Sequence, residues 1–135
     1  MPETPSPVVV PLDPAARATL TRHRIEVVTD GEPLRCEGVA LAALLQSSGA
    51  MADVHAGGAA LDRYVLVGAR GGGRTLFSLG ELDARLGNRD VYLVDRCNDA
   101  PLDADSGPLR VLVPGDASPA RSVRRVERIT VIAAP

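Results

Sequence analysis

The sequence predicts an α+β fold, with a mixed β-sheet and about three short helices. Short runs of branched apolar residues alternate with short helical patterns, and no segment has the length of a strand-helix-strand crossover unit. Hydrophobic residues make up 45% of the chain but aromatic residues only 2%, so the core has to consist of Val, Leu and Ala. A chain of 135 residues is long enough for one domain with its own core.

The start of the chain is rich in proline. We expect residues 1–12 to form a Pro-rich N-terminal segment, with a strand within 8–12, and residues 13–135 to form a single domain. Asp13 and Pro14 are an N-cap and first-turn pair, which predicts a short helix to about residue 20.

A hairpin and a helix follow. Apolar residues alternate with polar ones over 24–29 and again after a turn at 30–31, which predicts a β-hairpin with Cys36 pointing inward. Leucines at helical spacing predict a helix over 39–46, and Gly49 stands where a glycine would end it. Small residues over 50–60 predict a loop, in which His55 is exposed.

Strands and one helix are expected in the second half. Residues 64–67 and 76–77 form an antiparallel pair across a glycine-rich turn, for which a flexible hairpin tip is preferred over a phosphate-binding loop. Ser78 and Glu81 have the spacing of a capping box, and leucines after Ser78 follow a helical pattern. Further strands are expected over 91–94 and 127–132.

One short strand combines an apolar run with a charge. Pro108 and Pro114 bracket five residues, of which Arg110 is the only charged one. A guanidinium in apolar surroundings needs a carboxylate, a phosphate or several carbonyl groups. Arg110 therefore indicates a binding site or an ion pair, while a solvated position on an edge strand is the alternative.

Composition argues against several partners. The net charge is −2 and aromatic residues are scarce, so neither nucleic acid nor an anionic membrane is an expected partner. A nucleic-acid surface made of Arg121, Arg124, Arg125 and Arg128 is the weakest of the hypotheses. The chain contains no Lys, which excludes Schiff-base chemistry.

The two cysteines do not have the spacing of a zinc site. Cys36 and Cys97 lack CxxC spacing and nearby histidines, so no metal site is expected. We expect two reduced, buried thiols, with one disulfide as the alternative. No signal-peptide pattern begins the sequence as written, which favours the cytoplasm; export is the alternative if a leader has been removed.

The candidate binding residues lie close together in the sequence. Arg110, Arg121 and Arg124, together with the Ser122 hydroxyl, would suit an oxyanion, most naturally a phosphate. The alternative is that these arginines pair with the 17 acidic residues of the chain. No nucleophile, base and orienting group occur together, so no catalytic residue is assigned.

Several segments in order resemble the sulfite oxidase type of molybdopterin-binding domain. The resemblance covers roughly residues 24–132, and its specific part is the block from Gly107 to Arg124. The matching residues are Glu37, Gly38, Val39, Leu41, Leu44, Leu45, Phe77, Ser78, Glu81, Leu82, Asn98, Pro101, Leu102, Gly107 through Gly115, and Ser122 through Arg124. The resemblance implies an α+β fold and a pterin and phosphate site. Its cofactor-binding candidates here are Arg110, Ser122, Val123, Arg124, Ser106 and Gly107.

The chain departs from the family at the metal ligand. The enzymes bind molybdenum through a cysteine followed by Gly-Asn-Arg, and no such segment occurs in this sequence. Cys36 is too close to Gly38 to be that residue. The resemblance therefore implies a short, stand-alone member without the metal-ligand cysteine and without sulfite-oxidase-like turnover.

Two functional hypotheses follow. The first is a non-catalytic domain that holds molybdopterin or another phosphorylated small molecule. The second is a cofactor-free protein-interaction module that keeps the fold without the pocket. The two differ in whether Arg110 faces a cleft that accepts a ligand.

Overall fold

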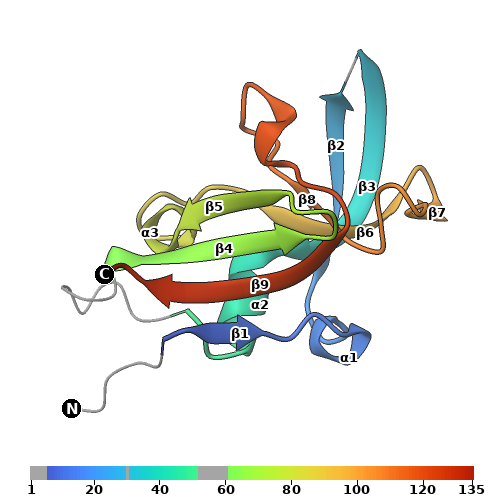
Figure 1. Cartoon of the computed structure of the whole chain (residues 1–135). Helices are drawn as coiled ribbons and strands as arrows, with labels where there is room; N and C mark the ends of the chain where they lie inside the picture. The colour runs from blue at the N-terminus through green and yellow to red at the C-terminus, as the bar shows by residue number, and fades with distance from the viewer. Residues whose placement is uncertain (1–5, 30, 52–60) are drawn as a thin grey trace.

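Two antiparallel β-sheets and three short α-helices make up the part of the chain that the structure describes (Figure 1). The structure is a computed structural model and describes residues 6–29, 31–51 and 61–135. The helices are α1 (Pro14–Arg17), α2 (Leu41–Ser47) and α3 (Leu79–Leu82), and a 3₁₀ turn, η3, covers Pro119–Arg121. The α+β prediction is confirmed.

The strands divide between the two sheets. One sheet has the order β1 (Val8–Val10), β9 (Val126–Ala133), β4 (Arg63–Ala69), β5 (Arg74–Ser78). The other has the order β2 (Arg22–Thr29), β3 (Glu32–Ala40), β6 (Tyr92–Cys97), with β7 (Ala100–Pro101) and β8 (Arg110–Leu112) both paired to β6. The sequence predicts a mixed sheet, whereas every described pair of strands is antiparallel. Parallel strands need a long crossover connection, and no connection between the described paired strands provides one.

The local sequence patterns form the structures that they predict, although some elements begin or end at other residues than predicted. Ser78 accepts a hydrogen bond from Glu81 N while the Glu81 carboxylate accepts one from Ser78 N, so the capping box is formed. Gly49 follows α2 with φ +77, a conformation that glycine adopts easily. The predicted helix over 39–46 begins two residues later, because Val39 continues β3 against β6. His55 lies outside the described residues.

The cysteine prediction is wrong: Cys36 and Cys97 form a disulfide. Antiparallel pairing of β3 with β6 places the two residues directly opposite each other, with their Cα atoms 4.0 Å apart. The register shifts between Glu37 and Gly38, where a Cβ on Gly38 would collide with the carbonyl oxygen of Leu93. Cys36 is buried, as the hairpin pattern predicts.

Two hydrophobic clusters support these sheets. The larger one lies between the sheets and α2, and contains Leu44 of α2, Val65 of β4 and Val111 of β8. The smaller one lies under the β2–β3 hairpin, which stands away from β4, β5 and β9 in Figure 1. Its buried members are Ile25, Cys36, Val94 and Leu112. No helix in the described part of the chain is long and apolar enough to cross a membrane.

The β2–β3 hairpin packs on only a small hydrophobic cluster, so we expect the disulfide that joins β3 to β6 to contribute strongly to stability. We predict that the double substitution Cys36→Ala and Cys97→Ala lowers the free energy of unfolding. The disulfide closes a loop with a sequence separation of 61 residues, and the loss of this constraint on the unfolded chain costs about 4 kcal/mol. Urea denaturation measures the difference. A reductant should destabilise the parent protein and leave the double variant unchanged; equal stability of the two proteins would contradict the prediction.

Candidate functional site

Arg110 begins β8, and its side chain is only 6% exposed. One edge of β8 pairs with β6. On the other edge, Val111 N donates a hydrogen bond to Val123 O at 3.0 Å, and Val126 N donates to Leu109 O at 2.9 Å. Since both edges of the strand are occupied, the sheet itself fixes the direction of the Arg110 side chain.

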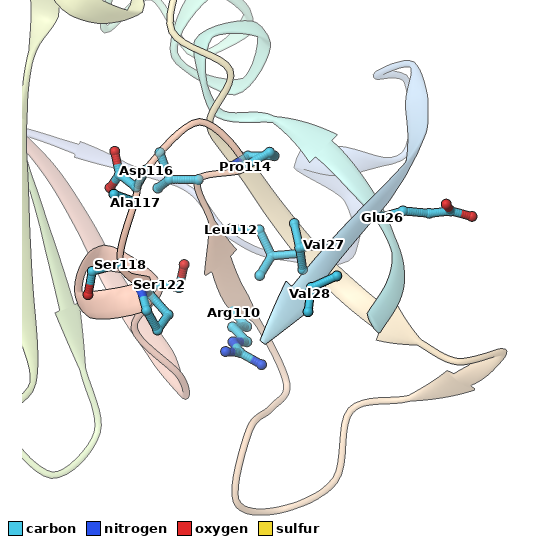
Figure 2. A pocket seen from close by; sticks show the side chains of 12 residues that line it. Glu26, Val27, Val28, Arg110, Leu112, Pro114, Asp116, Ala117, Ser118 and Ser122 are labelled. Carbon is cyan, nitrogen blue, oxygen red and sulfur yellow. The ribbon is translucent and has the colours of Figure 1, made fainter. Parts of the chain in front are cut away.

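A cleft of about 270 Å³ lies beside this side chain, and we call it the Arg110 cleft. Figure 2 shows its two walls: the end of β2 on one side, and β8 with the segment that follows it on the other. Val28, Leu112 and Pro114 make much of the wall apolar, and Ser122 contributes a hydroxyl. The lining residues are Glu26, Val27, Val28, Arg110, Leu112, Val113, Pro114, Asp116, Ala117, Ser118, Pro119 and Ser122. The structure thus brings Arg110 and Ser122 to one cleft.

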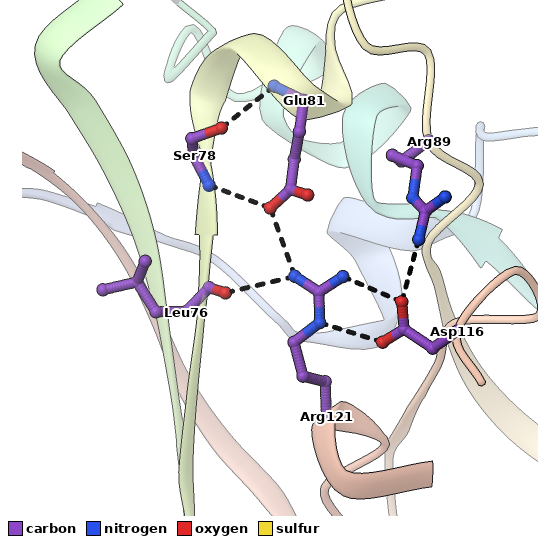
Figure 3. Close-up of polar contacts among 6 residues, drawn as sticks. All are labelled: Leu76, Ser78, Glu81, Arg89, Asp116 and Arg121. Carbon is purple, nitrogen blue, oxygen red and sulfur yellow. Dashed lines mark hydrogen bonds and ion pairs between the residues drawn. The ribbon is translucent and has the colours of Figure 1, made fainter. Parts of the chain in front are cut away.

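Arg121 does not take part in an anion site, although the sequence grouped it with Arg110 and Arg124. Its guanidinium forms two hydrogen bonds of 2.9 Å to the Asp116 carboxylate and one of 3.2 Å to Glu81 (Figure 3). It also lies 4.6 Å from the centre of the Phe77 ring. For this arginine, the alternative of pairing with acids of the chain is correct.

The Arg121 contacts change the acid-base behaviour of Asp116. Hydrogen bonds from Arg121 are the main cause that lowers the pKa of Asp116 below its usual value of 3.8, and Arg89 contributes a further hydrogen bond of 2.9 Å. The same pairing with Asp116 raises the pKa of Arg121. This network joins the segment after β8 to α3, because Arg121 also bonds Glu81.

A second cleft of about 500 Å³ contains the Ser-Val-Arg triplet, and we call it the Arg124 cleft. Its lining residues are Ala69, Arg70, Gly71, Gly73, Asp105, Ser122, Val123, Arg124 and Arg125. The side chain of Arg124 is exposed and makes no hydrogen bond or ion pair with a described residue. Three guanidiniums therefore face this cleft against the single carboxylate of Asp105.

Arg70 was not among the residues predicted from sequence, and Arg125 was named only in the nucleic-acid hypothesis. Arg70 follows β4, and its N–H donates to the carbonyl of Arg125 at 2.9 Å, which holds the two segments together. A Cβ on Gly71 would lie 3.2 Å from the Arg125 guanidinium, so the glycine turn gives this side chain room. Arg70 and Arg125 are 55 positions apart in the sequence, so no local sequence pattern reveals the hydrogen bond between them.

The remaining candidates, Ser106 and Gly107, lie on the other side of these arginines. Gly107 lines a third cleft of about 370 Å³, which we call the α1 cleft because Pro14 and Arg17 of α1 also line it. Ser106 accepts a hydrogen bond from Arg125 N through its carbonyl oxygen, at 2.8 Å. Five of the six predicted residues are therefore spread over three clefts, with Ser122 common to the first two, and Ser106 lines none of these clefts.

Comparison with known families gives one match. The model of the oxidoreductase molybdopterin-binding domain matches residues 28–135. The chain belongs to this family. The match includes the predicted residues from Ser106 to Arg124, and the resemblance to the sulfite oxidase type of domain is confirmed. No curated protein matches the chain.

The donor set of this molybdopterin-binding domain does not fit the metal of the family cofactor. The sequence contains two cysteines, and both are consumed by the Cys36–Cys97 disulfide, so neither provides a thiolate. Within residues 6–29, 31–51 and 61–135, no cluster of three or more His, Cys, Asp or Glu side chains could hold a metal ion. The Arg124 cleft does fit an anionic group such as a phosphate, because its guanidiniums outnumber its carboxylates.

The Asp116 network predicts a dependence of stability on pH. The lowered pKa means that the unfolded chain takes up a proton more readily than the folded domain. The stabilisation is complete above the unfolded pKa of about 3.9 and disappears as the pH falls through the folded pKa. We expect Asp116→Asn to be less stable than the parent near neutral pH by at most about 1 kcal/mol, since the pair is partly exposed, and the difference to shrink at low pH.

Urea denaturation across the acid range measures this effect. Asp62→Asn is the matched control, because Asp62 is exposed and forms no ion pair with a described residue. A constant difference between the Asp116 variant and the parent at every pH would show that the carboxylate does not act through its charge.

Proposed function

We propose that this domain binds a phosphorylated small molecule in the Arg124 cleft without catalysing a reaction on it. Molybdopterin, as the pterin phosphate, is one such molecule. The observation that carries the proposal is that Arg124 and Arg125 face the cleft and neither side chain is paired with an acid among the described residues. An anion that enters this cleft would therefore bind these two guanidiniums without breaking an ion pair between them and an acid of the described residues.

The chemistry of the lining supports a phosphate in particular. Arginine presents a planar fork of N–H donors that matches phosphate oxygens in a bidentate manner. The Ser122 hydroxyl adds a donor from the wall shared with the Arg110 cleft. Arg70 is partly neutralised by Glu127, which lies 4.0 Å away, so Arg124 and Arg125 supply most of the uncompensated positive charge.

The disulfide supports a binding role rather than redox catalysis. The family enzymes resembled here hold molybdenum through a cysteine, and this chain uses both of its cysteines to join β3 and β6. A phosphate site at the Arg124 cleft does not depend on a thiolate. The binding function and the metal function are therefore separable in this fold.

A protein-interaction module is the second candidate. One observation favours it: Val28 is 74% exposed at the edge of the Arg110 cleft, on β2, which is the edge strand of its sheet. An edge strand with an exposed apolar residue can pair with a segment of another protein. This reading predicts no change in any property when phosphate-bearing compounds are added.

We predict that Arg124→Gln weakens binding of pyrophosphate about tenfold or more, because a charge-assisted hydrogen bond to phosphate is lost. Isothermal titration calorimetry at constant ionic strength measures the affinity. Arg128→Gln is the matched control, since Arg128 is exposed on β9 and lines none of the three clefts. Both variants should keep the parent melting temperature.

The native ligand can be sought in the same preparation. Denaturing the purified protein and measuring oxidised-pterin fluorescence tests for a bound pterin, and mass spectrometry tests for molybdenum. If no pterin is released and neither phosphate nor pyrophosphate binds, the phosphate-binding proposal is wrong and the interaction module remains.

The disulfide also bears on where the protein works. Disulfides persist in oxidising compartments and are rare in the cytosol, so the Cys36–Cys97 bond supports the exported alternative over the cytoplasmic one. We predict that alkylation of intact cells before lysis leaves both cysteines unmodified until a reductant is added. Rapid labelling of both thiols without reductant would favour the cytoplasm.

A further inference from the structure

The α1 cleft and the Arg124 cleft share two residues. Arg70 and Arg125 line both of them, so the two clefts adjoin at these two residues. The α1 cleft has a volume of about 370 Å³. A molecule bound through phosphate in the Arg124 cleft would thus have a second cleft within reach across these two arginines.

The chemistry of the α1 cleft differs from that of the Arg124 cleft. Its lining residues are Leu12, Pro14, Arg17, Arg70, Gly107, Pro108, Leu109, Arg125, Val126 and Glu127. Leu12, Pro14 and Pro108 present aliphatic surface. Of the three arginines that also line this cleft, Arg17 pairs with Asp95 and Arg70 lies 4.0 Å from Glu127, so less uncompensated positive charge is present here than in the Arg124 cleft. This cleft is therefore suited to an apolar group rather than to another phosphate.

The wall made by the N-terminal segment is held in place before any ligand arrives. Arg17 donates a hydrogen bond through Nε to Leu12 O at 3.0 Å and another through a terminal nitrogen to Asp95 at 2.9 Å. Arg22 donates two further hydrogen bonds to the Asp95 carboxylate. These bonds are the main cause of the lowered pKa of Asp95, and they favour its ionised form. The segment from Leu12 to Arg17 is thereby tied to β6, which reduces the entropy cost of binding against it.

This wall lies outside the part of the chain that matches the family. The family match begins at residue 28, whereas Leu12, Pro14 and Arg17 precede it. The remaining lining residues of the α1 cleft all fall within the match. The cleft is thus completed by residues outside the family match, and these residues are where selectivity for one ligand over another would arise.

We propose that the ligand has two parts: a phosphate bound in the Arg124 cleft and an aromatic or otherwise apolar body bound in the α1 cleft. This inference rests on the proposed function. The planar guanidiniums of Arg70 and Arg125, between the two clefts, can stack on the face of an aromatic ring. The ligand class is therefore a phosphate ester of an apolar body, with Leu12 and Pro14 determining the selectivity of the α1 cleft.

The test compares three probes that carry the same anionic group: inorganic phosphate, glycerol 3-phosphate and 1-naphthyl phosphate. We expect 1-naphthyl phosphate to bind the parent protein about fivefold more tightly than inorganic phosphate, or better, because apolar area is buried. Glycerol 3-phosphate should gain nothing over inorganic phosphate. Isothermal titration calorimetry at constant ionic strength gives the three affinities.

Leu12→Gln should abolish the naphthyl gain while leaving the affinity for inorganic phosphate unchanged, which also shows that the variant is folded. Pro14→Gln, at an exposed position, is a second variant with the same expectation should Leu12→Gln fail to fold. Val9→Gln is the matched control, because Val9 is 62% exposed on β1 and lines none of the three clefts.

The outcomes separate the two proposals. Equal affinities for inorganic and naphthyl phosphate, both weakened by Arg124→Gln, would overturn the two-part ligand and leave the phosphate site standing. A naphthyl gain that survives both Leu12→Gln and Pro14→Gln would place the apolar body elsewhere and also overturn this inference. Failure of all three probes to bind would refute the phosphate site and the two-part ligand together.

Discussion

Main-chain hydrogen bonds made by residues 123–126 hold the candidate site together. Val123 O accepts from Val111 N in β8, and Val126 N donates to Leu109 O just before β8. Arg125 N donates to Ser106 O, and Arg125 O accepts from Arg70 N. One short segment thus fixes β8, the loop before it and the turn after β4. These bonds are backbone contacts, so they depend on chain path rather than on side-chain identity. The side chains of Arg124 and Arg125 in this segment remain exposed at the clefts, while Val126 is buried in the core.

The arginines of the site divide according to whether the chain already neutralises them. Arg121 lies on η3 and is bound by Asp116 and Glu81, so it ties α3 to the segment after β8. Arg124 lies three residues later and points into a cleft with no described acid paired to it. Neighbours in sequence therefore have opposite roles, because one side chain is built into the fold and the other is exposed at a cleft. Counting acids and bases in the sequence cannot separate these roles.

Local patterns predicted the fold better than they predicted the site. The β2–β3 hairpin, the Ser78 capping box and the β4–β5 pair depend on neighbouring residues, and each was predictable from spacing. The disulfide was not, since Cys36 and Cys97 meet only because β3 pairs with β6 through a shifted register. The contact between Arg70 and Arg125 was not predictable for the same reason, as the hydrogen bond between them joins distant parts of the chain. Residue chemistry alone selected Ser122 and Arg124 as candidates for an oxyanion, and resemblance to the family added Val123 between them.

The match to the molybdopterin-binding family covers residues 28–135. It includes the residues of the Arg124 cleft but not the N-terminal residues that line the α1 cleft. Both cysteines are in the disulfide and the metal-ligand segment of the family enzymes does not occur in the sequence, whereas the arginines of the Arg124 cleft depend on neither cysteine. Metal ligation and the proposed anion site therefore depend on different residues of the fold. The N-terminal segment adds an apolar wall beside the arginines, because Arg17 ties Leu12 to β6 through Asp95. Selectivity in this chain would thus come from a segment outside the family match, acting on a charge site that lies within it.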